Sequence, residues 1–436
     1  MCENKKSFRQ MVAIIGVFWS CLAAQAGEFA GGLGTPEDPY QIATAQQLAS
    51  VLGPPRWPRN HFILVNDIDL DPNLPGGRVF DGAVIASGAA PWREPFGGHF
   101  DGAGHTIRNM VIRIEDRSDP SLSTAGLFGR IHQNAVVRDL KIEAADVRVF
   151  DRRAGILAGE NAGRVVNCQV SGRISSGFVL QKKDEMDEVG GLVGRNMGDI
   201  IDCRADTDWV CGHRLAGGLV GENFSPGTIT GCRATCSQVS ALKHQGGGLV
   251  GGNSGVILDS YALGEILAPD SSFMHGGLAG TNRGTISGCH ADSDIVAGVR
   301  CSQLGSLVGE NWGAIANCYA RGSIAVQNQS YLIGGLIGWN LLPGSVANSY
   351  ATGKISVGAD SRYVGGLVGD DTGGDVHGSL WDVEATGVGV SAAGEGSTTE
   401  QMQQADTFLG WDFVDTWTIC EGQDYPRLRW EAVPCE

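Results

Sequence analysis

A nine-residue core, Gly-Gly-Leu-Val-Gly-x-Asn-x-Gly, recurs along this chain, and this recurrence is the strongest constraint on its fold. The leucine of the core appears nine times, at intervals of 27 to 35 residues and most often of 29 or 30. A period of this size is typical of a solenoid, in which each copy forms one coil and stacked coils bury each other's apolar side chains. The marker leucines are Leu127, Leu157, Leu192, Leu219, Leu249, Leu278, Leu307, Leu336 and Leu367.

Each copy has a second half in which a bend is expected. A β-branched residue is followed two positions later by Asn, Asp or Gly, the residues that adopt left-handed backbone angles at low cost. The next residue is Cys or Ser, and an Ala usually follows two positions later. Because side chains alternate along a strand, the β-branched residue, the Cys and the Ala would all face the interior. The bend column comprises Asn167, Asp202, Gly231, Asp259, Gly288, Asn317, Asn348 and Gly378.

The composition favours strands over helices. The chain has 66 glycines in 436 residues, which is about twice the usual ~7% share. Segments rich in Val and Ile are short and end at Gly or Asn, so they are too interrupted for helices. We therefore predict an all-β protein, a parallel β-helix (β-solenoid) of about nine coils with two or three short strands in each coil and short capping helices at both ends.

The residue after each core leucine is apolar in most copies, although in a straight strand it would point away from the interior. Two explanations are open: long loops between coils fold over these side chains, or the side chains form an association surface. The residues concerned are Phe128, Val193, Val220, Val250, Val308, Ile337 and Val368.

The core motif resembles that of the GLUG-motif family, which is named for a Gly-Leu-(any)-Gly sequence. The resemblance covers about residues 125–382, and the stretches 96–110, 380–387 and 421–428 are similar to the segments that flank such repeats in secreted bacterial proteins. It implies a right-handed β-helix on adhesin-like surface or secreted proteins, and no activity for the repeats themselves. The sequence Gly-Leu-Val-Gly stands at 191–194, 218–221 and 366–369.

The amino terminus has the pattern of a secretory signal. Three basic residues precede an apolar run at 11–24, and Ala24-Gln25-Ala26 has the small-x-small form of a signal-peptidase site. The run is shorter than the ~20 residues of a membrane span, and no other stretch approaches that length. We therefore predict a signal peptide at 1–26, cleaved near Ala26, and a secreted or cell-surface protein that does not span the membrane.

The charge balance disfavours one class of partner. The formal net charge is −16, and removing residues 1–26, with three positive charges and one negative, makes it −18. An acidic surface of this kind disfavours nucleic acid. An acidic surface is normal for a secreted protein and is also compatible with divalent cations, so charge alone selects neither.

Two capping boxes predict short helices at the ends of the solenoid. One is Thr44 to Gln47, which begins a stretch that continues to Leu52, and the other is Ser397 to Glu400, which precedes a helix at about 401–408. Such elements would cover the open ends of the solenoid. The predicted domains are a signal peptide at 1–26, an N-terminal cap with leading strands at 27–118, the repeat solenoid at 119–382 and a C-terminal cap or tail at 383–436.

Twelve cysteines in an exported chain usually indicate disulfides, but five of them occupy the column after the bend. Side chains stacked in parallel do not reach the geometry of a disulfide, so we predict a buried column of free thiols. Cys420 and Cys435 are the disulfide candidates because they would close a loop in the tail. Cys211, Cys236 and Cys301 are expected in variable loops and stay unassigned. The column consists of Cys168, Cys203, Cys232, Cys289 and Cys318.

Seven asparagines of the core motif would stack into a line of side-chain amides. We interpret this line as a structural ladder of hydrogen bonds, with ligand binding as the alternative. Separately, Asp67, Asp69 and Asp71 lie on one face of a predicted strand. They are weak candidates for calcium, and a solvated polar face is the alternative. The ladder residues are Asn161, Asn196, Asn223, Asn253, Asn282, Asn311 and Asn340.

An aromatic column is the main candidate for a binding face. Tyr261, His290, Tyr319 and Tyr350 follow the small inward residue on four consecutive coils, so we expect them to face solvent. Exposed rings at this spacing can stack on sugar rings or on a protein partner, or they can pack on each other beneath the inter-coil loops at 296–304 and 324–333. Two further rings, Trp312 and Trp339, lie near the asparagine turn.

No sequence pattern for catalysis is present. The chain has no His-Glu-x-x-His, Gly-x-Ser-x-Gly or Cys-x-x-Cys sequence, and no cofactor is predicted. The favoured hypothesis is a secreted, non-enzymatic β-solenoid that acts as a surface-structural or adhesion-type module and binds carbohydrate or protein. The alternative is a β-helix polysaccharide lyase or glycoside hydrolase, which needs acids that converge in one groove.

Overall fold

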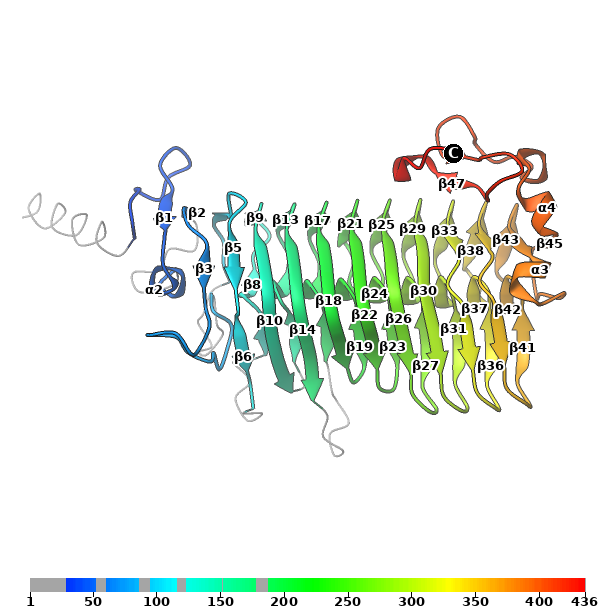
Figure 1. The fold of residues 1–436 in the computed structure, drawn as a ribbon, viewed down its shortest axis with the longest axis horizontal. Helices are drawn as coiled ribbons and strands as arrows, with labels where there is room; N and C mark the ends of the chain where they lie inside the picture. The colour runs from blue at the N-terminus through cyan, green and yellow to red at the C-terminus, as the bar shows by residue number, and fades with distance from the viewer. Residues whose placement is uncertain are drawn as a thin grey trace, which may run out of the picture.

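The structure is a computed structural model in which the chain forms a parallel β-solenoid of about nine coils (Figure 1). This confirms the predicted fold class. The predicted signal peptide lies outside the described residues, which are 29–51, 60–85, 95–115, 123–150, 152–177 and 187–435.

Each complete coil contributes to four sheets, which we call A, B, C and D, with one strand in each sheet except where the sheet B strand is divided in two, as in β34 (Tyr319–Ala320) and β35 (Ile324–Val326). In a middle coil the strands are β20 (Val220–Asn223), β21 (Thr228–Thr230), β22 (Arg233–Ala241) and β23 (Gln245–Gly247), and each pairs in parallel with its counterpart in the next coil. The prediction of two or three strands per coil was too low, because both the bend column and the Gly-Leu pair divide the chain into separate strands.

Sheets A and B lie on either side of the bend column. Sheet A consists of β1 (Tyr40–Ile42), β2 (His61–Leu64), β4 (His99–Asp101), β9 (Val136–Arg138), β13 (Arg164–Val166), β17 (Asp199–Ile201), β21, β25 (Val256–Leu258), β29 (Thr285–Ser287), β33 (Ala314–Ala316), β38 (Ser345–Ala347) and β43 (Asp375–His377). Sheet B consists of β3 (Ile68–Asp69), β5 (Thr106–Arg108), β6 (Val111–Arg113), β10 (Lys141–Phe150), β14 (Gln169–Gly177), β18 (Arg204–Gly212), β22, β26 (Tyr261–Ala268), β30 (His290–Ala297), β34 (Tyr319–Ala320), β35 (Ile324–Val326), β39 (Tyr350–Ala351), β40 (Ile355–Val357), β44 (Leu380–Asp382) and β45 (Glu395–Ser397).

Sheets C and D meet at the Gly-Leu pair. Sheet C consists of β8 (Phe128–Ile131), β12 (Ala158–Asn161), β16 (Val193–Asn196), β20, β24 (Val250–Asn253), β28 (Ala279–Asn282), β32 (Val308–Asn311), β37 (Ile337–Leu341) and β42 (Val368–Thr372). Sheet D consists of β7 (Thr124–Ala125), β11 (Arg153–Gly155), β15 (Glu188–Gly190), β19 (Leu215–Gly217), β23, β27 (Phe273–Gly276), β31 (Ser302–Gly305), β36 (Tyr331–Gly334) and β41 (Arg362–Gly365).

The Gly-Leu pair forms a corner rather than part of a straight strand. In one coil, β15 ends at Gly190, the corner contains Gly191 and Leu192, and β16 begins at Val193. Leu192 and Val193 are both fully buried in the core. The prediction that the residue after the leucine points outward was therefore wrong, because the corner interrupts the alternation. Neither covering loops nor an association surface is needed to explain its apolar character.

The second bend has the backbone that the sequence predicts. Every member of the bend column has a positive φ, from 47° at Asp259 and Asn348 to 64° at Gly231. The chain turns there from sheet A into sheet B, and the following Cys or Ser is buried. Parallel stacking begins ahead of the first glycine-leucine copy, since β1, β2 and β4 already belong to sheet A.

The asparagine side chains form a continuous buried ladder. Each Nδ2 donates to the Oδ1 of the next coil at 2.8–2.9 Å, beginning with Asn161 to Asn196 and ending with Asn340 to Asp371. Five of the seven Oδ1 atoms also accept from the backbone of the turn that follows, as where Asn161 Oδ1 accepts from the Gly163 amide at 3.1 Å. The ladder therefore satisfies polar groups that would otherwise be buried without partners.

The cysteine column is buried and contains no disulfide. All five thiols are at most 1% exposed, and each contacts backbone carbonyls, as where Cys203 Sγ donates to Ile201 O at 3.2 Å. Burial raises the pKa of Cys203, so its reactive thiolate form is disfavoured. Cys211, Cys236 and Cys301 are also free and buried, and the first two lie in strands rather than loops.

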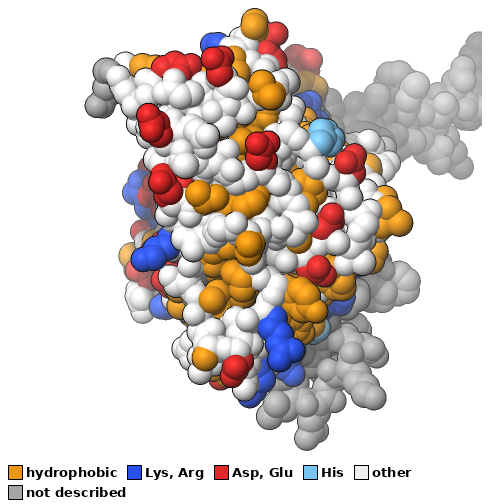
Figure 2. Space-filling view, turned by 90° about the vertical axis from the view of Figure 1, so that its right-hand side faces the viewer, with side chains coloured by type: hydrophobic (Ala, Val, Ile, Leu, Met, Phe, Trp, Pro, Cys, Tyr) orange, Lys and Arg blue, Asp and Glu red, His pale blue; other side chains and the backbone are white. Residues whose placement is uncertain are grey.

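Caps of different construction cover the two ends. At the N-terminal end, α2 (Ala45–Ala49) begins at Thr44, whose hydroxyl accepts from the Gln47 amide, and aromatic side chains such as Phe62 and Phe96 fill the core. At the other end, α3 (Val383–Thr386), β45 and α4 (Thr399–Met402) follow the last coil, and Figure 2 shows that hydrophobic side chains remain visible on this end among scattered acidic ones.

The second capping box lies one residue later than predicted. It consists of Thr398 and Gln401, not Ser397 and Glu400. Ser397 is instead the last residue of β45 and pairs with Asp382, so it is not available as a helix cap. The helix is accordingly shorter than the predicted 401–408, and the 3-10 helix η2 (Ala405–Thr407) follows it.

The last part of the chain, residues 403–435, which we call the tail, runs back along the solenoid (Figure 1). It contains η2, β46 (Trp417–Thr418), β47 (Arg427–Leu428) and η3 (Arg429–Glu431), and a disulfide joins Cys420 to Cys435. The Trp411 indole donates to the Gly378 carbonyl at 2.8 Å and the Trp430 indole to the Gly288 carbonyl at 2.9 Å. These two glycines are three coils apart in the bend column, so the tail crosses successive coils.

The tail covers most of the aromatic column, which we had expected to face solvent. His290 is 6% exposed, and Tyr319 and Tyr350 are 0% exposed. Their rings stack on one another with centroids 4.7 and 5.1 Å apart, and Trp417 of the tail packs on both tyrosines. Tyr261 is half-buried at the end of the column, where it stacks on His290 and Trp430.

The inter-coil loops have a different position from the one predicted. The connections within 296–304 and 324–333 join the carboxyl ends of sheet B strands to sheet D, whereas the aromatic column lies at the amino ends of those strands. The segment that covers the aromatic column is therefore the tail, which lies outside the repeats. The repeat pattern alone does not indicate it.

We predict that Leu249→Asp prevents stable folding. Leu249 is fully buried, and an unpaired carboxylate at that site costs several kcal/mol. Leu242→Asp is the matched control because Leu242 lies in the same coil and is 37% exposed. Circular dichroism and thermal unfolding measure both variants. Equal melting curves for the two would contradict the assignment of the leucine column to the core.

We also predict that Tyr319→Ser with Tyr350→Ser loosens the tail. Replacing large buried aromatic side chains by small ones costs about 3–5 kcal/mol per site, so the unfolding midpoint should fall by several degrees. Tyr331→Ser with Tyr363→Ser is the control pair, since these rings are 45% and 59% exposed. Tryptophan fluorescence reports directly on the tail. A melting curve unchanged from that of the control pair would show that the tail does not depend on these rings.

Candidate functional site

The first residues of the sheet B strands form a single row along the solenoid, which we call the edge row. Residues in register on neighbouring strands occupy it, and the spacing between strands is about 4.8 Å. The half toward the N-terminal end is charged or polar, whereas the other half is aromatic. In order, the row reads Lys141, Gln169, Arg204, Arg233, Tyr261, His290, Tyr319 and Tyr350.

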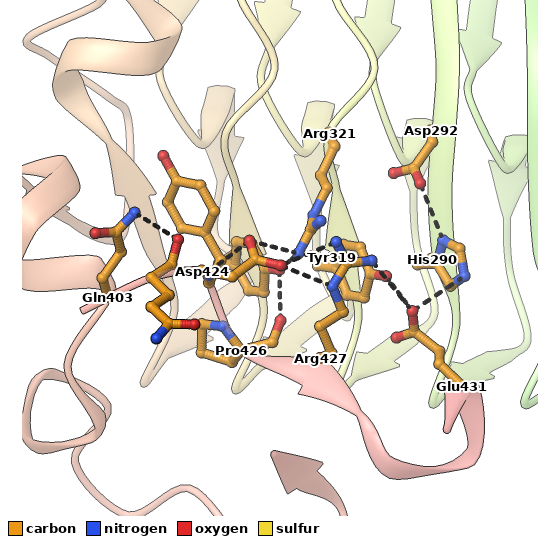
Figure 3. Close-up of polar contacts among 12 residues, drawn as sticks. His290, Asp292, Tyr319, Arg321, Gln403, Asp424, Pro426, Arg427 and Glu431 are labelled. Atoms are coloured by element: carbon orange, nitrogen blue, oxygen red, sulfur yellow. Dashed lines mark hydrogen bonds and ion pairs between the residues drawn. The ribbon is translucent and has the colours of Figure 1, made fainter. Parts of the chain in front are cut away.

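Polar contacts fix the tail over the aromatic half (Figure 3). The Tyr319 hydroxyl donates to the Glu431 carboxylate at 2.8 Å, and the Tyr350 hydroxyl donates to the Pro426 carbonyl at 2.6 Å. Arg321 donates to the Tyr350 hydroxyl at 3.1 Å. These bonds satisfy phenol groups that the tail removes from water, and burial raises the pKa of both tyrosines.

Ion pairs and a neutral histidine complete this contact. Asp424 lies 3.8 Å from Arg321 and 2.9 Å from Arg427, so one tail carboxylate joins a solenoid arginine to a tail arginine (Figure 3). Burial, together with the positive charges of Arg321 and Arg427, lowers the pKa of His290 to about 3. The imidazole is therefore neutral at physiological pH, as its stacking between rings requires. The aromatic half is thus an internal docking surface for the tail.

The polar half of the edge row lines an open groove of about 580 Å³. Tyr261 lies where the tail ends, and the edge over β13, β17 and β21 is left uncovered in Figure 1. On the other side of the groove the bend column supplies polar side chains. The groove is lined by Asp101, Ala103, Gly104, Asp139, Lys141, Asn167, Cys168, Gln169, Asp202, Cys203, Arg204, Gly231, Arg233 and Tyr261.

Some charged side chains at the groove are held in place by ion pairs or hydrogen bonds, whereas another is not. Arg138, just outside it, contacts both Asp101 at 2.5 Å and Asp139 at 3.7 Å. Gln169 donates to Asp206 at 3.1 Å, and Arg204 also pairs with that carboxylate. By contrast, the Lys141 ammonium makes no ion pair within the described part of the chain.

The groove therefore presents fixed hydrogen-bond donors and acceptors, with one aromatic ring at its end. Arg233 Nη1 lies 3.5 Å from the Tyr261 hydroxyl, which places a guanidinium beside that ring. Cations and carboxylates are both present, so the groove does not select a ligand by net charge alone. Such a surface can bind a neutral or zwitterionic hydroxylated polymer through many moderate hydrogen bonds.

The two predicted tryptophans lie on a different face, in and beside sheet C. The Trp312 indole donates to the Glu310 carboxylate at 2.6 Å, and the Trp339 indole donates to the Thr372 hydroxyl at 3.0 Å. Their N–H groups are therefore engaged within the chain. The structure does not bring them together with the aromatic column, because the asparagine turn and the edge row belong to different corners of the coil.

The three aspartates at 67–71 do not converge on one point. Asp67 accepts from the Thr106 amide, Asp69 accepts from the Asn109 side chain, and Asp71 accepts from Asn73. Within the described residues, no group of three or more His, Cys, Asp or Glu side chains has an arrangement that could hold a metal ion. The calcium candidate is therefore not supported by the geometry, because neighbouring donors occupy each carboxylate separately.

Sequence reasoning identified the aromatic half of the edge row but missed the polar half. The signal was present: the same column, read upstream of Tyr261, gives Arg233, Arg204, Gln169 and Lys141. What the column could not show is that a distant segment covers one half and leaves the other open.

No helix in the described ranges combines the length and apolar character needed to cross a membrane.

Comparison with known proteins gives limited stretches of similarity. The chain is 36% identical over 166 residues to a protein of Evansella cellulosilytica named as a Gly-rich membrane protein, and the match covers 36% of this chain and 17% of that protein. It is 30% identical over 164 residues to halomucin of Haloquadratum walsbyi, covering 37% of this chain and 2% of halomucin. The chain thus spans only a small part of these curated relatives.

Among solved structures, the chain is similar to a crystal structure from Bacteroides ovatus described as an immunoglobulin A1 protease. The identity is 18%, the TM-score is 0.40, and the alignment covers 92% of this chain and 96% of the other. The family model of the GLUG motif matches residues 329–356, which include β36, β37, β38, β39 and the start of β40. This segment therefore carries a GLUG motif, and a similar sequence recurs in the other coils.

Proposed function

We propose that this chain is a non-enzymatic, adhesion-type module of a secreted or cell-surface protein, and that its open groove binds an extended extracellular glycan. The observation that carries the proposal is the continuity of the edge row. Its aromatic half binds the tail of the same chain, whereas its polar half continues the same row and has no described segment over it.

The shape of the groove favours a polymer over a compact ligand. From Lys141 to Tyr261 the edge row advances by four strands, or about 20 Å along the axis. The lining repeats along this direction with similar donors at each strand. A polymer with repeating hydroxyl groups matches this periodicity, because successive units would meet equivalent positions in register.

The chemistry of the groove favours carbohydrate over a protein segment. The tail is held by packed tryptophans and tyrosines, whereas the open half contains one ring, Tyr261, and otherwise charged and amide side chains. Arginine, lysine, glutamine and carboxylate groups together supply donors and acceptors for sugar hydroxyls. A single ring at one end can stack on one sugar face.

The proposed location rests on the sequence and on the relatives. The basic and apolar pattern of residues 1–26 is typical of an exported chain. One relative is named as a membrane protein, and the other is named halomucin. A rigid rod of stacked coils suits a role in holding a binding surface away from a cell.

A second candidate function is a polysaccharide lyase or glycoside hydrolase. One observation favours it: Asp101 and Asp139 both contact the Arg138 guanidinium, so two carboxylates lie near each other at the groove. Paired acids in a groove are a requirement of such enzymes.

We predict that Lys141→Gln with Arg233→Gln weakens glycan binding at least tenfold, because both cations lie on the floor of the groove. A glycan array identifies the ligand, and calorimetry then compares the variant with the parent protein. Arg164→Gln is the control, since Arg164 is an exposed arginine on sheet A outside the groove.

Two results would contradict the proposal. Unchanged affinity in the groove variant would place the binding site elsewhere. Steady release of reducing ends or unsaturated products from the bound glycan would replace the non-enzymatic module with the second candidate, and Asp139→Asn should then abolish that release.

A further inference from the structure

A second concave site lies at the carboxyl ends of the long sheet B strands, away from the open groove. Its volume is about 400 Å³, and we call it the arginine pocket. Strands β6, β10, β14 and β18 form it, and their register places Arg113 beside Arg148 and Arg173 beside Trp209. None of its residues lines the open groove.

The arginine pocket concentrates positive charge on an acidic protein. Arg113 and Arg173 both donate to the same oxygen, Asp146 Oδ2, at 2.5 and 2.6 Å. Burial opposes ionisation of Asp146, but these two arginines lower its pKa, so the carboxylate is ionised. Asp208 also acts on Arg173. With Arg148, three guanidinium groups face two carboxylates, which leaves the site positive although the chain carries a net charge of −16.

One arginine of the pocket makes no ion pair with the described residues. Arg148 is exposed, and its one described side-chain contact is with the face of the Phe150 ring, 5.9 Å from the centroid. Its guanidinium group is therefore free to bind an anionic group of a ligand.

An exposed tryptophan borders the same pocket. Trp209 is 40% exposed on β18, where the register with β14 shifts and places it opposite Arg173. An exposed indole beside cationic side chains offers an apolar face on which a sugar ring can stack. The combination of an anion-binding guanidinium and a free ring face matches a saccharide that carries an acidic group.

We propose that the arginine pocket binds an acidic saccharide. Its carboxylate or sulfate group accepts hydrogen bonds from Arg148, while its ring stacks on Trp209. Arg113 and Arg173 are held in place by Asp146 and contribute to the positive field. This site is independent of the glycan proposed for the open groove.

The test uses calorimetry with the purified protein and three hexasaccharides: a sulfated one, a uronate and a neutral one. We expect an acidic hexasaccharide to bind and the neutral one not to bind at this site. Arg148→Gln and Trp209→Ala should each weaken that binding at least tenfold. Whichever acidic hexasaccharide binds, the sulfated one or the uronate, identifies the acidic group that the pocket recognises.

Control variants distinguish binding at the arginine pocket from the loss of any arginine or tryptophan elsewhere on the surface. Arg164→Gln removes an arginine of sheet A, and Trp312→Ala removes a tryptophan that is 36% exposed, so both should bind within about twofold of the parent. Lys141→Gln with Arg233→Gln should also leave this binding unchanged, which distinguishes it from the groove. Thermal unfolding of each variant verifies its fold.

Three outcomes would overturn the proposal. One is equal binding of acidic and neutral hexasaccharides. Another is unchanged affinity in Arg148→Gln and Trp209→Ala. The third is inorganic sulfate binding as tightly as the sulfated hexasaccharide with no effect of Trp209→Ala, which would leave a simple anion site in place of a saccharide site.

Discussion

The close approach of backbones at the glycine corner is the constraint on which the rest of the structure depends. A Cβ at Gly190 would collide with the Val193 carbonyl of its own coil, and a Cβ at Gly191 with the Gly218 carbonyl of the next. Glycine at these positions lets the corner fold tightly while neighbouring coils keep the strand spacing of a parallel sheet. Leu192 and Val193 can then both enter the core from adjacent positions. A side chain at the corner would push neighbouring coils apart.

The same repeated backbone carries different surfaces along the length of the solenoid. The repeats supply equivalent positions at every coil, and the identity of the side chain at one position, the edge row, decides what binds there. Where the row is aromatic, the tail packs on it with indole and phenol groups. Where it is cationic or amide-bearing, the groove stays open. Binding surfaces on this fold therefore change by substitution within a column, without any change in the backbone that carries them.

The sequence predicted most of the frame because its signals are local and repeated. The bend column has the expected positive φ at every position, and the cysteine column is buried as its alternation with Ile and Ala required. The prediction at the corner was wrong because it continued the inward and outward alternation of a strand through Leu192 and Val193. The turn at these residues interrupts that alternation. For the candidate site, the sequence predicted only the aromatic half of the edge row. Nothing within a repeat of about 29 residues shows that Trp430, which lies 140 residues from His290, stacks on that ring. The sequence also does not show that Arg113, Arg148 and Arg173, from three different strands, line one pocket.

The asparagine ladder also gives the rod an electrical direction. Every side-chain amide donates toward the C-terminal end, so the dipoles of Asn161 through Asn340 add along the axis, much as peptide dipoles add in a helix. The series ends at Asp371, whose carboxylate accepts from Asn340 and from the Gly374 amide and has no amide hydrogen to pass on. A negative charge thus stands at the positive end of an aligned row of dipoles. The coils are consequently not interchangeable: a coil with aspartate at this position terminates the series, and a solenoid of this kind is extended by insertion ahead of that coil rather than by addition after it.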